Sequence, residues 1–242
     1  MRKIIAVLTS IIILAGCAEH DPILPGVRTP IFDTGNIDVL DTTIENLPEN
    51  IDAPKQDECP YTQDSSNVIR DGDRKIFSGF PTSNSVASTQ KPVCANGYVY
   101  AGLTTGEVVK IAPNSRRVIW IADVFRRSNM TGGASIVDII APLVIHNGAV
   151  YAGGLGDAFC RINATSGQKK WCVDIGVGVP FIVTDNAAFI VATDGNLYAV
   201  RTSDGAVYWR TAVRDVVAPV YKDKTIVVGK EKFNAVNGEK IK

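Results

Sequence analysis

From Pro92 onward the chain repeats itself, and a chain that repeats must fold as a series of similar units. Each unit begins with Pro and a short apolar stretch, then has a polar turn and a second apolar stretch. These openings span residues 92–102, 142–153, 180–190 and 219–229. Later in each unit come a Gly turn, a second turn and then a Trp. The Gly turns are Gly106, Gly156 and Gly195; the second turns lie near Arg116, Gly167 and Gly205; and a Trp follows four residues later, at Trp120, Trp171 and Trp209.

Each unit therefore divides into four short strands. Val, Ile, Tyr and Phe dominate the apolar stretches, Asn, Asp, Gly and Ser dominate the turns, and no 3.6-residue period is present. Four strands repeated about every 40 residues are typical of a β-propeller blade. We predict an all-β fold, an incomplete β-propeller of four-stranded blades with about three full blades and part of a fourth, since Lys242 falls where the fourth Trp is expected. The recurrent Trp is predicted to pack between neighbouring blades.

The N-terminus predicts export. Arg2 and Lys3 precede an apolar stretch that is too short to span a bilayer, and residues 14–17 read Leu-Ala-Gly-Cys. This tetrapeptide resembles the bacterial lipobox, which implies a signal peptide over residues 1–16 and acylation of Cys17 with palmitate-type chains. Because Ala18 rather than Asp follows, the resemblance implies a lipid anchor in the outer membrane, with the protein facing the periplasm.

Residues 17–70 are predicted to be an irregular tether, and residues 71–242 the partial propeller. The tether is rich in Pro, Asp, Asn and Thr, which favour turns and extended chain. Ile31-Phe32 and Ile37 to Leu40 are the two places where it could dock as an edge strand. Without residues 1–16 the chain has two fewer basic than acidic side chains and no basic run, so we expect no nucleic-acid partner.

Four cysteines remain beside Cys17, in a compartment where disulfides persist. If residues 165–167 form a hairpin loop, Cys160 lies opposite Cys172. Either a disulfide or two buried thiols fit that position. The sequence does not fix the position of Cys59 relative to Cys94.

The repeat, with its Gly-x-x-x-Trp after a polar turn, resembles the quinoprotein-type propeller repeat, and its lipoprotein form resembles the BamB family. The segments that carry the closer resemblance are Cys17, residues 24–28 (Leu-Pro-Gly-Val-Arg), and residues 137–171. The resemblance implies a non-catalytic periplasmic scaffold in the assembly of outer-membrane β-barrel proteins, with a BamA-like barrel-assembly subunit as partner.

In the family, loops on one face of the ring contact that subunit, and one loop carries an acidic pair. Asp138 matches the first acid of the pair and Ile140 stands at the second, while Val86-Ala87 replaces a Leu-Arg pair on a neighbouring loop. The resemblance thus implies Asp138 as a partner contact. Phe125, Arg126 and Arg127 form the next candidate because aromatic and Arg side chains are enriched at interfaces.

An enzyme is the alternative, since quinone-dependent dehydrogenases share this repeat. Those enzymes have a calcium site and two adjacent cysteines, and this sequence has no adjacent cysteines. Of its two histidines, His20 lies in the predicted tether and His146 has no Cys or carboxylate nearby at the spacing of metal ligands, and no catalytic motif is visible. We therefore expect no enzyme activity, no metal and no pyrroloquinoline quinone. A degenerate propeller fragment without activity is the third interpretation.

Overall fold

The computed structural model describes residues 37–51, 57–82, 86, 90–125 and 136–241, all of which belong to one compact unit, Gly35–Lys242. The predicted signal peptide, Cys17, Arg126 and Arg127 lie outside the described residues. No helix in the described part of the chain is long and apolar enough to cross a membrane.

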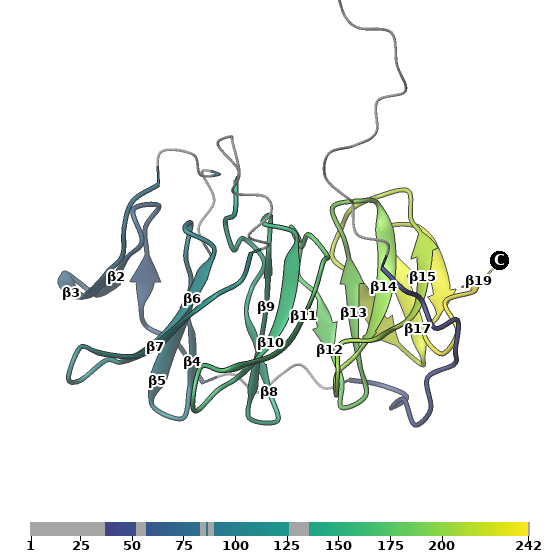
Figure 1. Cartoon of the computed structure of the whole chain (residues 1–242), viewed down its shortest axis with the longest axis horizontal. Coiled ribbons are helices and arrows are strands. Elements are labelled where there is room, and N and C mark those ends of the chain that lie inside the picture. The colour runs from purple at the N-terminus through teal and green to yellow at the C-terminus, as the bar shows by residue number, and fades with distance from the viewer. Residues whose placement is uncertain (1–36, 52–56, 83–85, 87–89, 126–135, 242) are drawn as a thin grey trace, which may run out of the picture. The chain divides into compact units, whose positions relative to one another are not determined.

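Four four-stranded antiparallel sheets follow one another along the chain (Figure 1). In each sheet the strands are hydrogen-bonded in chain order, as the repeats predict. The first two sheets consist of β4 (Val93–Ala95), β5 (Tyr98–Gly102), β6 (Glu107–Ala112) and β7 (Arg117–Asp123), then β8 (Val144–His146), β9 (Ala149–Gly154), β10 (Ala158–Asn163) and β11 (Lys169–Val173). The last two consist of β12 (Ile182–Val183), β13 (Ala187–Val191), β14 (Asn196–Arg201) and β15 (Val207–Ala212), then β16 (Val220–Lys222), β17 (Thr225–Val228), β18 (Glu231–Asn234) and β19 (Lys240–Ile241). The predicted all-β fold of four-stranded blades is confirmed.

The number of sheets exceeds the prediction. The fourth sheet has all four strands, because Lys240 and Ile241 already pair with β18. A further three-stranded sheet precedes the first repeat and consists of β1 (Thr62–Gln63), β2 (Val68–Asp71) and β3 (Arg74–Ser78). β1 and all but the last residue of β2 lie inside the segment that is predicted as tether.

The sheets pack face to face, and the packed faces form the core. Between the first two four-stranded sheets, Tyr100 and Trp120 on one side meet Val150 and Ile162 on the other. Equivalent clusters join the other neighbouring sheets. A single sheet has no interior of its own, so each sheet depends on its neighbours for the burial of its apolar residues.

The hairpins show why these residues form these strands. Asn96-Gly97 and Asn147-Gly148 are two-residue turns with positive φ at both positions, the type I′ geometry that suits strand twist. A register shift recurs between the third and fourth strands of the first three four-stranded sheets, and also within β2–β3.

Residues 37–51 also belong to the fold. Val39 forms a parallel bridge with Val207 on β15, and the side chains of Ile44 and Leu47 are buried in the core between the last two sheets. Docking at residues 37–40 was foreseen as an alternative, and we refer to residues 37–51 as the strap. Ile31-Phe32, the other predicted docking segment, lies outside the described residues.

Candidate interaction surfaces

The Trp of each repeat packs on the second turn of the next sheet. A Cβ atom built on Gly167 would lie 2.6 Å from Cγ of Trp120, and one on Gly205 would lie 2.9 Å from Cδ2 of Trp171. The indole Nε1 of Trp120 donates to the carbonyl of Ala164 over 3.2 Å. The Gly at these turns therefore allows both a positive φ and the close approach of an indole from the preceding sheet.

The same junction holds a buried charge that the sequence did not point to. Lys110 lies between apolar residues of β6, and its Nζ donates to the Ala164 carbonyl over 2.8 Å. Nζ also lies 4.0 Å from the ring centroid of Tyr98, a cation–π contact. Burial lowers the pKa of Lys110. A single Lys inside an apolar strand was the only signal in the sequence.

Asp138 is buried, contrary to its predicted place on an exposed loop. Its Oδ2 accepts a hydrogen bond from the Val86 amide over 2.7 Å, and its backbone carbonyl accepts one from Leu155. Burial raises the pKa of the Asp138 carboxyl. The carboxylate is directed at the chain's own backbone, so Asp138 holds two loops together and does not itself present a surface to a partner.

Phe125 lies on the same face of the molecule. A Cβ atom built on Gly106 would lie 2.8 Å from Cδ1 of the Phe125 ring, and one built on Gly156 would lie 2.6 Å from Cβ of Phe125. Phe125 therefore wedges between the turn after β5 and the turn after β9. Phe125 and Asp138, both candidate contacts from the sequence, thus meet Val86 on one face, which also carries the exposed side chain of Ile136. We call residues 86, 125 and 136–138 the loop face.

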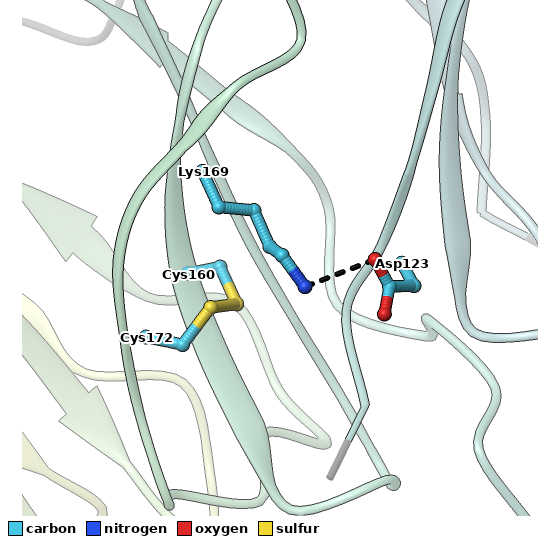
Figure 2. Close-up of a disulfide and its surroundings, with 4 residues drawn as sticks. All are labelled: Asp123, Cys160, Lys169 and Cys172. Carbon is cyan, nitrogen blue, oxygen red and sulfur yellow. Dashed lines mark hydrogen bonds and ion pairs between the residues drawn. A yellow bond between two sulfur atoms is a disulfide. The ribbon is translucent and has the colours of Figure 1, made fainter. Parts of the chain in front are cut away.

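Two disulfides fix strands at other places. Cys160 and Cys172 are directly opposed on β10 and β11, with Cα atoms 4.1 Å apart, and form one bond (Figure 2). Cys59 and Cys94 form the other, which ties the segment before β1 to β4.

His146 lies at the end of β8 in a shallow pocket of about 520 Å³ that the strap helps to line. Its Nε2 lies 2.7 Å from Oδ1 of Asp185, and the Asn147 amide donates to the same oxygen. Asn147 lies in the short turn between β8 and β9, and Asp185 lies in the short turn between β12 and β13. The ring nitrogen Nε2 of His146 therefore has the carboxylate of Asp185 and the side-chain amide of Asn147 as its neighbours.

Comparison with known proteins gives the family. A family model described as "Outer membrane protein assembly factor BamB" matches residues 77–237, about two thirds of the chain. The chain belongs to the BamB family. Among curated proteins it is 26% identical over 141 residues to the outer membrane protein assembly factor BamB of Moranella endobia, and 24% identical over 150 residues to that of Escherichia coli K12.

These matches cover 57% and 61% of this BamB-family chain but only 36% and 38% of the two relatives. The chain therefore spans little more than a third of the length of the curated relatives that it matches. Among solved structures, BamB from Moraxella catarrhalis superposes with a TM-score of 0.57 at 17% identity, covering 69% of this chain and 54% of that one. That likeness supports the propeller fold.

The described residues contain neither a metal-binding cluster nor a disulfide between adjacent cysteines. Within the described ranges, no three His, Cys, Asp or Glu side chains lie close enough to hold a metal ion. All four described cysteines are in disulfides between separate strands or segments, none between adjacent residues.

Proposed function

We propose that this BamB-family protein is a non-catalytic scaffold in the assembly of β-barrel proteins into the outer membrane. The family match carries the proposal, because the model's description and the curated relatives name that process. The architecture agrees with it. Its turns and sheet edges are surfaces that a partner protein can bind, while the Asp138 carboxylate on the loop face accepts a hydrogen bond from the Val86 backbone.

The proposed partner is a BamA-like barrel-assembly subunit, and the proposed contact is the loop face. Ile136 is 43% exposed there, next to the half-buried ring of Phe125. Apolar and aromatic side chains on a rigid loop are the kind of anchor that contributes most to interfaces. Asp138 acts as a positioning residue, since it fixes the loop that carries Ile136 to the segment around Val86.

We further propose that the protein reaches its partner as a lipoprotein, with Cys17 acylated and the propeller in the periplasm. The N-terminal sequence supports this placement, because a short apolar stretch with a basic start ends in Leu-Ala-Gly-Cys. Two or more acyl chains hold a protein stably on a bilayer, whereas one holds it only marginally.

Affinity purification of the tagged full chain from gently solubilised envelopes tests the proposal, with partners identified by mass spectrometry. We expect the barrel-assembly subunit to co-purify, and an Ile136→Lys variant to reduce its recovery by about tenfold, as for loss of one interface anchor. Leu40→Lys is the matched control, since Leu40 is 45% exposed on the strap. If a folded, well-expressed protein recovers no assembly component, the proposal is wrong.

A further inference from the structure

The strap shows how an outer strand of this fold takes an added segment. Leu40 N–H donates to the Val207 carbonyl over 2.9 Å, and Thr42 N–H donates to the Tyr208 carbonyl over 3.1 Å. Both acceptors are on β15, the outermost strand of its sheet. The side chains of Ile37 and Val39 pack beside Val207, which is only 1% exposed. The segment runs parallel to β15 and covers its apolar edge.

The register shift makes two adjacent carbonyls of β15 available. Between Val200 and Ala199 the pairing with β15 skips Tyr208, so Val207 and Tyr208 both turn a carbonyl away from β14. The bulge thus fixes the positions at which an added strand can donate its amides to β15, and so sets the register of that strand.

β7 is the equivalent strand of the first four-stranded sheet and has the same shift. Its pairing with β6 skips Ile119, which places Val118 and Ile119 at the positions of Val207 and Tyr208. Among the described residues, β7 has a strand neighbour on one side only, β6. β7 thus repeats the backbone arrangement to which the strap binds on β15.

Two apolar side chains of β7, Val118 and Ile121, are exposed. Val118, the equivalent of the buried Val207, is 38% exposed, and Ile121 is 49% exposed. Trp120 and Ala122 point into the core with the next sheet, so Ile121 projects from the opposite face of the strand. Two exposed apolar side chains beside an open strand edge form a surface suited to strand addition.

The remaining comparison is β11, whose edge differs. Lys169 stands at the position of Val118, and Cys172, in its disulfide, stands at the position of Ile121. Lys169 is paired with Asp123 of β7 over 2.9 Å, as Figure 2 shows. The position of Val118 is thus apolar and buried on β15 (Val207), charged on β11 (Lys169), and apolar and exposed on β7.

We propose that the outer edge of β7, with Val118 and Ile121, binds an extended segment of another polypeptide in which every second residue is apolar. The added segment donates its amides to the Val118 and Ile119 carbonyls and lays an apolar side chain on Val118, as the strap does on Val207. A second apolar side chain lies on Ile121, where β15 has the exposed Arg210. The inference deepens the proposed function and rests on it for the identity of the ligand, because the membrane strands of outer-membrane barrel proteins alternate in this way.

The test is binding of a fluorescein-labelled peptide of about ten residues, with the alternating sequence of a membrane β-strand, to the purified full chain. Fluorescence anisotropy gives the affinity. We expect the Val118→Lys/Ile121→Lys variant to bind about tenfold more weakly or worse, and a peptide N-methylated at alternate amides to lose binding by a similar factor. Val217→Lys, at a site that is 41% exposed in another segment, is the matched control and should bind like the wild type.

Each other outcome overturns the inference. Equal binding by the β7 variant places the peptide elsewhere, and equal binding of the N-methylated peptide rules out strand pairing. A dimer in sedimentation that the β7 variant abolishes would identify a second copy of the chain as the occupant instead. Co-purification of the barrel-assembly subunit is expected to persist in the β7 variant and to fall with Ile136→Lys, so failure here is distinguishable from failure of the proposed function.

Discussion

Replacing Gly167 by Ala tests whether contact between a Trp and the next turn holds neighbouring sheets together. Gly167 has φ near +74°, and an added Cβ would lie 2.6 Å from Cγ and 2.8 Å from Cβ of Trp120. Both neighbouring atoms are at the rigid base of the indole side chain. The Nε1 hydrogen bond to Ala164 further restrains the ring.

Two terms add to give the expected loss of stability. A non-Gly residue in the left-handed region costs about 1–2 kcal/mol. An overpacked methyl in a rigid core costs about 1–3 kcal/mol more. We therefore expect the free energy of unfolding to fall by about 2–5 kcal/mol in Gly167→Ala.

Gly97→Ala is the matched control, because Gly97 has φ near +76° and nothing lies within 4 Å of its built Cβ. The free energy of unfolding of Gly97→Ala should fall only by the backbone contribution of about 1–2 kcal/mol. Urea unfolding followed by Trp fluorescence and circular dichroism measures both variants. In a Trp120→Val background, the further effect of Gly167→Ala should shrink to the value of the control. Equal losses in Gly167→Ala and Gly97→Ala, to within about 0.5 kcal/mol, would refute the reasoning.

Three further predictions concern other parts of the fold. Replacing Cys160 and Cys172 together by Ala should lower the free energy of unfolding by about 3 kcal/mol, since the bond closes a short loop, and urea unfolding measures it. Burial raises the pKa of Tyr100 and Tyr198 to about 12, so the folded state keeps protons that the unfolded chain releases above about pH 10. Stability should therefore be complete below pH 10 and fall by about 1.4 kcal/mol per pH unit for each Tyr up to pH 12, as urea midpoints across that range will show. Leu47→Ala should cost about 2–5 kcal/mol in thermal or urea unfolding, because Leu47 is buried between the last two sheets.

Each of these has its own control. Dithiothreitol should lower the melting temperature of the wild type by more than that of the double Ala variant, and equal shifts would contradict a role for this disulfide. A free energy of unfolding that does not change between pH 10 and pH 12 would show that the two phenols ionise alike in both states. Leu40→Ala, on the same strap but 45% exposed, should change stability by no more than about 0.5 kcal/mol. A loss as large as that of Leu47→Ala would contradict the packing.

The repeating units could be predicted because their signals are local. Turn residues and alternating apolar stretches depend on neighbours in sequence, so the strands from Val93 onward follow the expected order. A hairpin loop over residues 165–167 places Cys160 opposite Cys172, as observed, but it does so by pairing Ala164 with Gln168. That register is wrong by one residue at the turn. Asn163 and not Ala164 pairs with Gln168, and the later bulge at Lys170 restores the offset.

Features that depend on distant contacts could not be predicted. The strap has the composition of a tether, and only its neighbours in space show that Ile44 and Leu47 are core residues. The sheet β1–β3 lacks the Trp that marks the first three repeats, and Asn67, with its own positive φ, replaces the turn Gly. The burial of Asp138 depends on a backbone amide 52 residues away. In each case tertiary contact overrides a local pattern that indicates loop.

The most direct test of the proposed role is the outer-membrane content of folded β-barrel proteins in cells that lack this gene. The account predicts fewer barrel proteins that migrate as heat-modifiable folded species, with recovery when the full chain is supplied and poorer recovery with Ile136→Lys. Unchanged levels of folded barrel proteins in the deletion strain would contradict a role in their assembly.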